Sequence, residues 1–185
     1  MALKAKIIGR NELLRQMALI EPNIVNSIAG MQMKVARELA QKIQTRAPVG
    51  SAADRGRPPG YYRDSIHADR LADRPDAKLK GLQRTTDPNA TGIFALWIWH
   101  FLEFGTQPHT IRARNAPRLV FTGRDGERVS AVEVSHPGTP AQPHIFPTYR
   151  AERTNIARRV SRAMRSALKK ALANQSVSKG QEPAD

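Results

Sequence analysis

Histidine and carboxylate side chains are the groups in this sequence that could bind a metal ion or move protons. The five histidines include no pair at helical spacing with a carboxylate nearby, the arrangement that zinc enzymes use. A loose acidic group lies in the middle of the chain, but it lacks the regular spacing of a metal site. Its members are Asp54, Asp64, Asp69, Asp73, Asp76 and Asp87, with Glu103 beyond them. We therefore expect no metal site, and a metal-dependent nuclease is the weakest hypothesis.

Motifs for nucleophilic or phosphate chemistry are also missing. The stretch at residues 56–60, Gly-Arg-Pro-Pro-Gly, has prolines where a phosphate-binding loop needs backbone N–H donors. The absence of cysteine excludes disulfides, thiol nucleophiles and cysteine-based zinc sites. No elbow motif marks a serine nucleophile. The sequence therefore predicts a protein that is not an enzyme and has no cofactor.

Positive charge is the strongest compositional feature. Thirty Lys and Arg residues stand against 16 Asp and Glu residues, so that the net charge is +14 and the pI is about 11.0. A charge of this size favours a polyanionic partner, either nucleic acid or an acidic protein surface. No apolar run is long enough to span a bilayer, and the N-terminal residues lack a secretory signal. We expect a soluble cytoplasmic protein without a membrane partner.

Hydrophobic periodicity predicts two long helices. Apolar residues step by three or four positions over residues 22–46, and Pro48 ends that helix. A similar stripe over residues 147–174 predicts the second helix, with arginines on its other faces. Alternation at residues 3–8 and a capping asparagine before residues 12–20 predict a short strand and a short helix ahead of them.

The segments between the long helices predict loops and short strands. Residues 47–60 are rich in Pro and Gly and form a flexible loop or arm. Strands are also expected at residues 61–71 and 79–86, although neither segment has a clean alternating pattern. Residues 119–121 and 129–134 flank Gly123-Arg124-Asp125-Gly126, a typical composition for the turn of a hairpin.

Together these elements predict a single α+β domain over residues 1–174. An antiparallel β-sheet packs against the long N-terminal and C-terminal helices, with the hairpin and the Pro/Gly-rich arm inserted. Residues 175–185 form a polar C-terminal tail. No internal repeat is present.

Residues 92–105 are the densest apolar segment. They contain five of the ten aromatic residues of the chain, between Phe94 and Phe104. Because Lys and Arg do not alternate with these rings, a buried strand that runs into a turn is a better interpretation than a base-stacking surface. His100 and Glu103 interrupt the segment and need polar partners if they are buried.

Four short motifs follow one another in a defined order. They are Thr45-Arg46-Ala47-Pro48-Val49-Gly50, Tyr62-Arg63-Asp64-Ser65-Ile66, Trp99-His100-Phe101-Leu102-Glu103-Phe104-Gly105-Thr106 and Pro140-Ala141-Gln142-Pro143-His144-Ile145-Phe146-Pro147. This order resembles that of the small tail-completion, or head–tail joining (neck), proteins of long-tailed bacteriophages and prophages, a family of minor tail components, over about residues 3–172. The sequence departs from the family pattern at Asp64, at His144 and in a longer hairpin.

The resemblance implies a structural virion protein. Such a protein assembles in the host cytoplasm as a homo-oligomeric ring, expected to be hexameric, at the junction of head and tail. Its partners are the neighbouring neck proteins (connector or stopper, tail terminator or tail tube), and DNA passes through the lumen. A tail terminator, a stopper, another minor tail protein and a basic DNA-binding protein remain alternatives.

Three groups of residues follow as candidates for function. In the fold-defining motif we expect Gly105 to take a positive φ or to allow a close backbone approach. We expect Phe104 to anchor the turn in the core, and Glu103 to accept backbone N–H bonds or pair with an arginine. That motif comprises Glu103, Phe104, Gly105, Thr106, Pro143, Phe146 and Pro147. Subunit or partner contacts are expected from Arg55, Arg57, Tyr61, Tyr62 and Arg63, and a basic helix face from Arg158, Arg159, Arg162 and Arg165.

Overall fold

The computed structural model describes residues 22–50, 57–74, 87, 89–123 and 125–179. The strand expected at residues 3–8, the short helix before Pro22 and the strand expected at residues 79–86 lie outside these ranges. The helices are α2 (Pro22–Gln44), α3 (Tyr61–Asp64), α4 (Trp99–Phe104) and α5 (Ile145–Lys179). The strands are β1 (His67–Arg70), β2 (Thr91–Phe94), β3 (His109–Arg112), β4 (Leu119–Thr122), β5 (Arg128–Ala131) and β6 (Glu133–His136).

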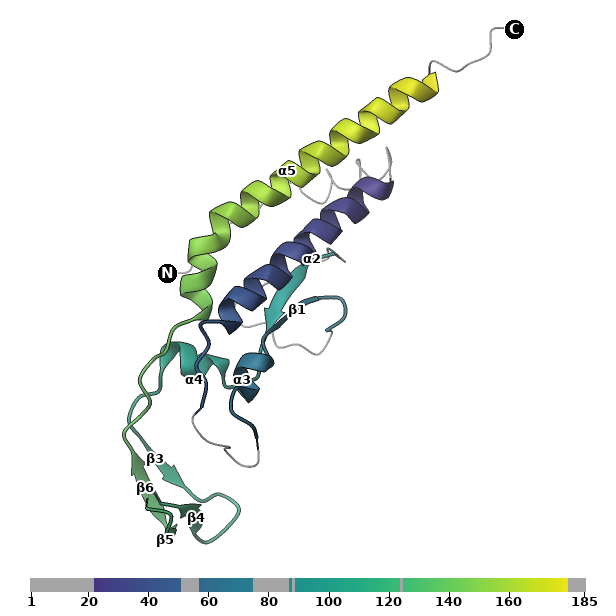
Figure 1. The fold of residues 1–185 in the computed structure, drawn as a ribbon. Coiled ribbons are helices and arrows are strands. Elements are labelled where there is room, and N and C mark those ends of the chain that lie inside the picture. Colours follow the sequence, from purple (N-terminus) through teal and green to yellow (C-terminus); the bar gives the residue numbers. More distant parts are fainter. Residues whose placement is uncertain (1–21, 51–56, 75–86, 88, 124, 180–185) are drawn as a thin grey trace, which may run out of the picture.

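The described part of the chain is elongated, with the two long helices side by side (Figure 1). Helix α2 lies between α5 and the antiparallel pair of β1 and β2. At one end, a hairpin extension (residues 109–136) projects away from the helices (Figure 1). In it β3 pairs with β6, and β4 pairs with β5, both antiparallel. The α+β class and the two long helices are confirmed.

The core runs along α2 in two clusters. Near the C-terminal end of α2, Ile43 and Ile66 are 0% and 1% exposed and pack with Leu39, Ala40, Ala47 and Tyr62. Near its N-terminal end, α2 packs through Ile24 and Ile28 on Ala171 of α5. The apolar stripe of α2 is therefore used on both sides, by α5 and by the β1–β2 pair.

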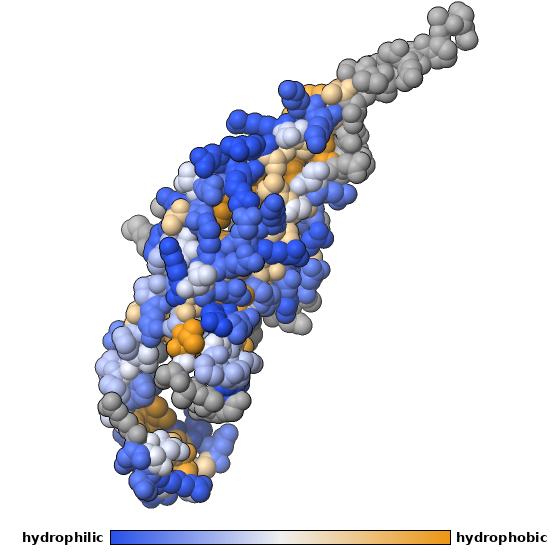
Figure 2. All heavy atoms as spheres, viewed as in Figure 1, coloured by the Kyte–Doolittle hydropathy of each residue, from blue (hydrophilic) through white to orange (hydrophobic). Residues whose placement is uncertain are grey.

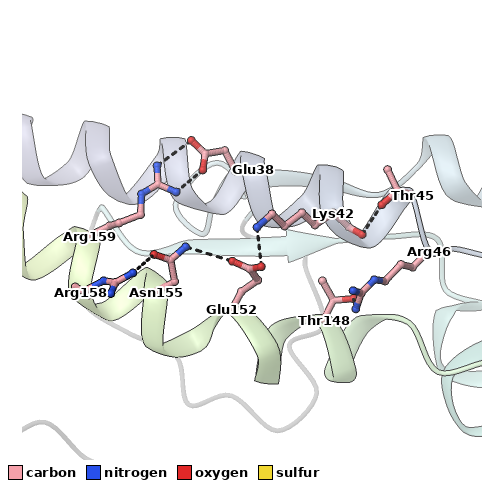
Figure 3. Close-up of polar contacts among 9 residues, drawn as sticks. All are labelled: Glu38, Lys42, Thr45, Arg46, Thr148, Glu152, Asn155, Arg158 and Arg159. Carbon is pink, nitrogen blue, oxygen red and sulfur yellow. Dashed lines mark hydrogen bonds and ion pairs between the residues drawn. The ribbon is translucent and has the colours of Figure 1, made fainter.

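A row of polar contacts joins α2 to α5 beside the apolar core (Figure 3). The Arg159 guanidinium makes a bidentate pair with Glu38, in which Nη2 lies 2.9 Å from Oε1. The Lys42 ammonium lies 2.6 Å from Glu152 Oε1. Along this row the residue numbers increase in α2 while they decrease in α5, because the two helices are antiparallel. Hydrogen bonds from Arg159 and from Lys42 lower the pKa of the Glu38 and Glu152 carboxyls, respectively.

Three expected strands differ from the structure. Residues 61–71 begin as the short helix α3, because Gly60 at φ +85° turns the chain and accepts the Asp64 N–H at 2.9 Å. The apolar segment at residues 92–105 is a strand only at its start, in β2 at residues 91–94, since β1 offers no partner beyond the pair of His67 with Phe94. Residues 129–134 divide into β5 and β6, which pair with different strands. Among the described residues the strands form three two-stranded ribbons instead of one sheet.

The row of polar contacts between α2 and α5 predicts how the free energy of unfolding depends on pH. Because both carboxyl pKa values are lower in the folded chain, the stabilisation is present above the unfolded value, 4.5, and is lost as pH falls through the folded values. In urea unfolding between about pH 7 and pH 3, the double variant Glu38→Gln, Glu152→Gln should therefore show a shallower loss of stability than the wild type. The exposed Glu127, which takes no part in an ion pair of the described residues, supplies a Gln control. Identical slopes for wild type and double variant would contradict the prediction.

Candidate functional site

The buried carboxylate of Glu103, at the end of α4, caps the start of α5. Its Oε2 accepts the backbone N–H groups of His144 and Ile145, both at 2.8 Å, and its Oε1 accepts that of Phe146 at 2.9 Å. Pro147 has no N–H to satisfy. The first donors of the helix, which have no partner within the helix, are thus bound by one side chain, and its negative charge lies at the positive end of the helix dipole. Of the two roles expected for Glu103, the structure shows the acceptance of backbone N–H bonds.

A buried polar chain continues from this cap into the core. The Nδ1 atom of His144 lies 2.7 Å from the Gln142 carbonyl, which can only accept, so Nδ1 carries a proton. In the neutral ring Nε2 then accepts the Tyr62 hydroxyl proton, at 2.7 Å. Burial, with the nearby Glu103 carboxylate, raises the pKa of Tyr62 and keeps that proton in place. Further along, Thr148 Oγ1 donates to the His144 carbonyl at 2.6 Å and accepts from Arg46 at 3.2 Å.

Gly105 lets two distant segments cross closely after α4. Its φ is +71°, as expected, and a Cβ there would lie 2.6 Å from the Thr139 carbonyl oxygen. Thr106 and Thr139 exchange backbone hydrogen bonds of 2.9 Å and 3.2 Å, and the Gln142 N–H donates to the Leu102 carbonyl at 2.7 Å. These bonds join the end of α4 to the segment that leads from the hairpin extension into α5.

Two aromatic residues have the opposite burial from that expected. Phe104 was expected in the core but is 64% exposed, because the last turn of α4 directs Glu103 inward and the next residue outward. Tyr62 was expected at a partner contact but is 7% exposed, because its hydroxyl reaches His144.

Trp97 and Phe101, in the apolar segment at residues 92–105, also reach the surface, so the expectation that this segment is buried is wrong at these positions. Phe104 and Phe146 lie 5.8 Å apart between ring centroids, and both contact Trp99. We call Trp97, Phe101, Phe104 and Phe146, each at least 38% exposed, the aromatic patch. In Figure 2, apolar surface emerges among hydrophilic atoms near the start of α5 and again on the hairpin extension.

The remaining predicted contact residues lie near α3. Arg57 stacks over the exposed Tyr61 ring at 4.8 Å, and Arg63 pairs with Asp64 at 2.8 Å. That pair raises the pKa of Arg63 and lowers that of Asp64. Arg55 lies outside the described residues. Pro143 is exposed just before α5.

The four arginines of the predicted basic face do not share one role. Arg159 binds Glu38 of α2 and belongs to the packing between the helices. Arg158, Arg162 and Arg165 are exposed. A fourth exposed cation, Lys169, continues their face at helical spacing and was missed, although the spacing of four residues from Arg165 could have revealed it.

No group of three His, Asp or Glu residues in the described part of the chain could hold a metal ion. The hollow between α2 and α5, near Glu38 and Lys42, measures about 10 Å³, close to the minimum for one water molecule. No described helix has the length and apolar character needed to cross a bilayer.

Comparison with protein-family models, with curated proteins and with solved structures finds no match for this chain.

The cap on α5 gives a stability prediction. Glu103→Gln keeps the shape but removes the charge and one acceptor, so that at least one buried N–H loses its partner. We expect the free energy of unfolding, measured with urea, to fall by about 3 kcal/mol, which is the upper end of the range for a hydrogen bond to a charged group. Glu133→Gln, in an exposed pair with Arg112, is the matched control and should change stability little. Equal effects of both substitutions would show that the cap is not needed.

Proposed function

We propose that this chain is a structural subunit of a bacteriophage neck, which forms a ring at the head–tail junction, completes the tail and joins it to the head connector. The motif order supports this reading, because the residues that carry the resemblance include Glu103 and Gly105, which join α4 to α5. A protein of this kind acts by shape and contact, and it needs no cofactor.

The hairpin extension is the observation that carries the proposal. Ile111, Val120, Phe121 and Val132 are 38–61% exposed on it, although two-stranded ribbons are marginally stable in water by themselves. Residues paired directly across strands lie on one face, so Ile111 adjoins Val134 and Phe121 adjoins Val129. These apolar faces suit burial against a neighbouring protein.

Two separate apolar surfaces on one chain suit a ring. The extension projects from one end of the molecule (Figure 1), whereas the aromatic patch consists of Trp97, Phe101 and Phe104 in or next to α4 and Phe146 in the first turn of α5. When one surface of a subunit contacts a different surface of the next, the contact is heterologous, and it closes into a ring if the rotation permits. A tail terminator, a stopper or another minor tail protein would use the same surfaces, and the experiment below separates these roles.

Electron microscopy of particles made without this gene tests the proposal. Deletion in the phage that encodes the chain should give DNA-filled heads beside separate tails of normal length. Tails of irregular or excess length would indicate a terminator instead. Complete, infectious virions would overturn the structural role.

Complementation of that deletion tests the hairpin extension itself. The double variant Phe121→Asp, Val132→Asp should leave heads and tails separate, because charge replaces the apolar faces. The control Thr110→Asp, Thr122→Asp adds the same charge at exposed polar positions of the same hairpin extension and should restore joined particles. Circular dichroism of the purified variants checks that α2 and α5 still form. Full rescue by the first variant would show that the extension is not the contact.

A further inference from the structure

One face of α5 carries a straight row of cations. Arg158, Arg162, Arg165 and Lys169 follow one another at intervals of four, three and four residues, which places them on one side of a helix. All four are exposed. We call them the basic stripe.

Within the described residues, the basic stripe lies on the side of α5 opposite the one that packs on α2. The side of α5 that packs on α2 carries Met164, Ala167, Leu168 and Ala171. Within the described residues none of the stripe cations forms an ion pair, and Arg158 only donates to the Asn155 side chain at 3.2 Å. Hydrophilic surface covers much of the region around α5 in Figure 2. These charges are therefore available to an external anion.

The residues between the cations favour nucleic acid over an acidic protein. Ser161 and Ser166 are exposed beside the stripe, and no large apolar side chain is exposed from Arg158 to Lys169. Protein interfaces have an apolar or aromatic core, whereas interfaces with DNA are polar and strongly positive. Serine hydroxyls, like Arg and Lys, are common partners of phosphate oxygens.

We propose that the basic stripe binds the phosphate backbone of duplex DNA without sequence preference. From Arg158 to Lys169 the helix rises by about 16 Å, along which a duplex carries about 10 negative charges. The row can thus follow the duplex and contact several phosphates at once. Contacts of Arg and Lys with phosphate oxygens position a protein on the duplex but carry no sequence information.

This inference deepens the proposed ring function by naming what the outer face of α5 contacts. Identical subunits of net charge +14 repel one another, and a polyanion along the basic stripe would offset that repulsion. DNA binding is measured on the purified chain and head–tail joining on particles, so that either proposal can fail alone.

Fluorescence anisotropy with labelled 25-base-pair duplexes of two unrelated sequences, at several NaCl concentrations, tests the proposal. The wild-type chain should bind both duplexes equally, with an affinity that falls steeply with salt. In Arg162→Ala, Arg165→Ala the slope of log affinity against log salt should decrease by about 2, because two phosphate contacts are lost.

The control Arg37→Ala, Arg70→Ala removes the same charge from α2 and β1, at exposed residues without an ion pair in the described structure. It should keep most of the wild-type slope. Equal losses in both double variants would show a diffuse effect of net charge, and tighter binding of polyglutamate than of DNA would indicate an acidic protein partner. Either result, or the absence of DNA binding, would overturn the proposal.

Discussion

The contact between the Glu103 carboxylate and the start of α5 determines where the longest described helix begins and how it is held. Three backbone N–H groups donate to this one buried side chain. Two residues later, the close approach at Gly105 joins the same end of α4 to the segment that enters α5. The hairpin extension on one side and α5 on the other both leave from this point (Figure 1). Because a buried carboxylate without its donors would be costly, the geometry of this junction is tightly specified.

Much of the fold follows from local patterns. The apolar stripes predicted both long helices, although α5 runs on to Lys179, into the segment expected to be a polar tail from residue 175. The glycines of the hairpin turn predicted the pairing of β4 with β5. The strands next to α3 and α4 were not predictable in the same way. Their extent depends on which segment pairs with them, and the positive φ of Gly60 starts a helix where composition suggested a strand.

The candidate site was predictable where a residue type has one dominant use. The positive φ of Gly105 was expected, and acceptance of backbone N–H bonds was one of the two roles expected for Glu103. That these bonds cap α5, with partners more than 40 residues away, required the structure. The burial of Tyr62 and the exposure of Phe104 were predicted in the wrong sense, because an apolar composition does not tell which face of a short helix turns inward. Arg159 likewise looks the same in the sequence as its exposed neighbours until Glu38 is placed beside it.

The proposal makes the chain an architectural part whose exposed surfaces are completed by neighbours in a virion: apolar ones on the hairpin extension and around the start of α5, and a positive one along α5. Immunogold electron microscopy tests this most directly, with antibodies raised against the chain and virions purified from the phage that encodes it. Gold particles should lie at the junction of head and tail. Virions without label, or label confined to another part of the particle such as the tail tip, would contradict the account.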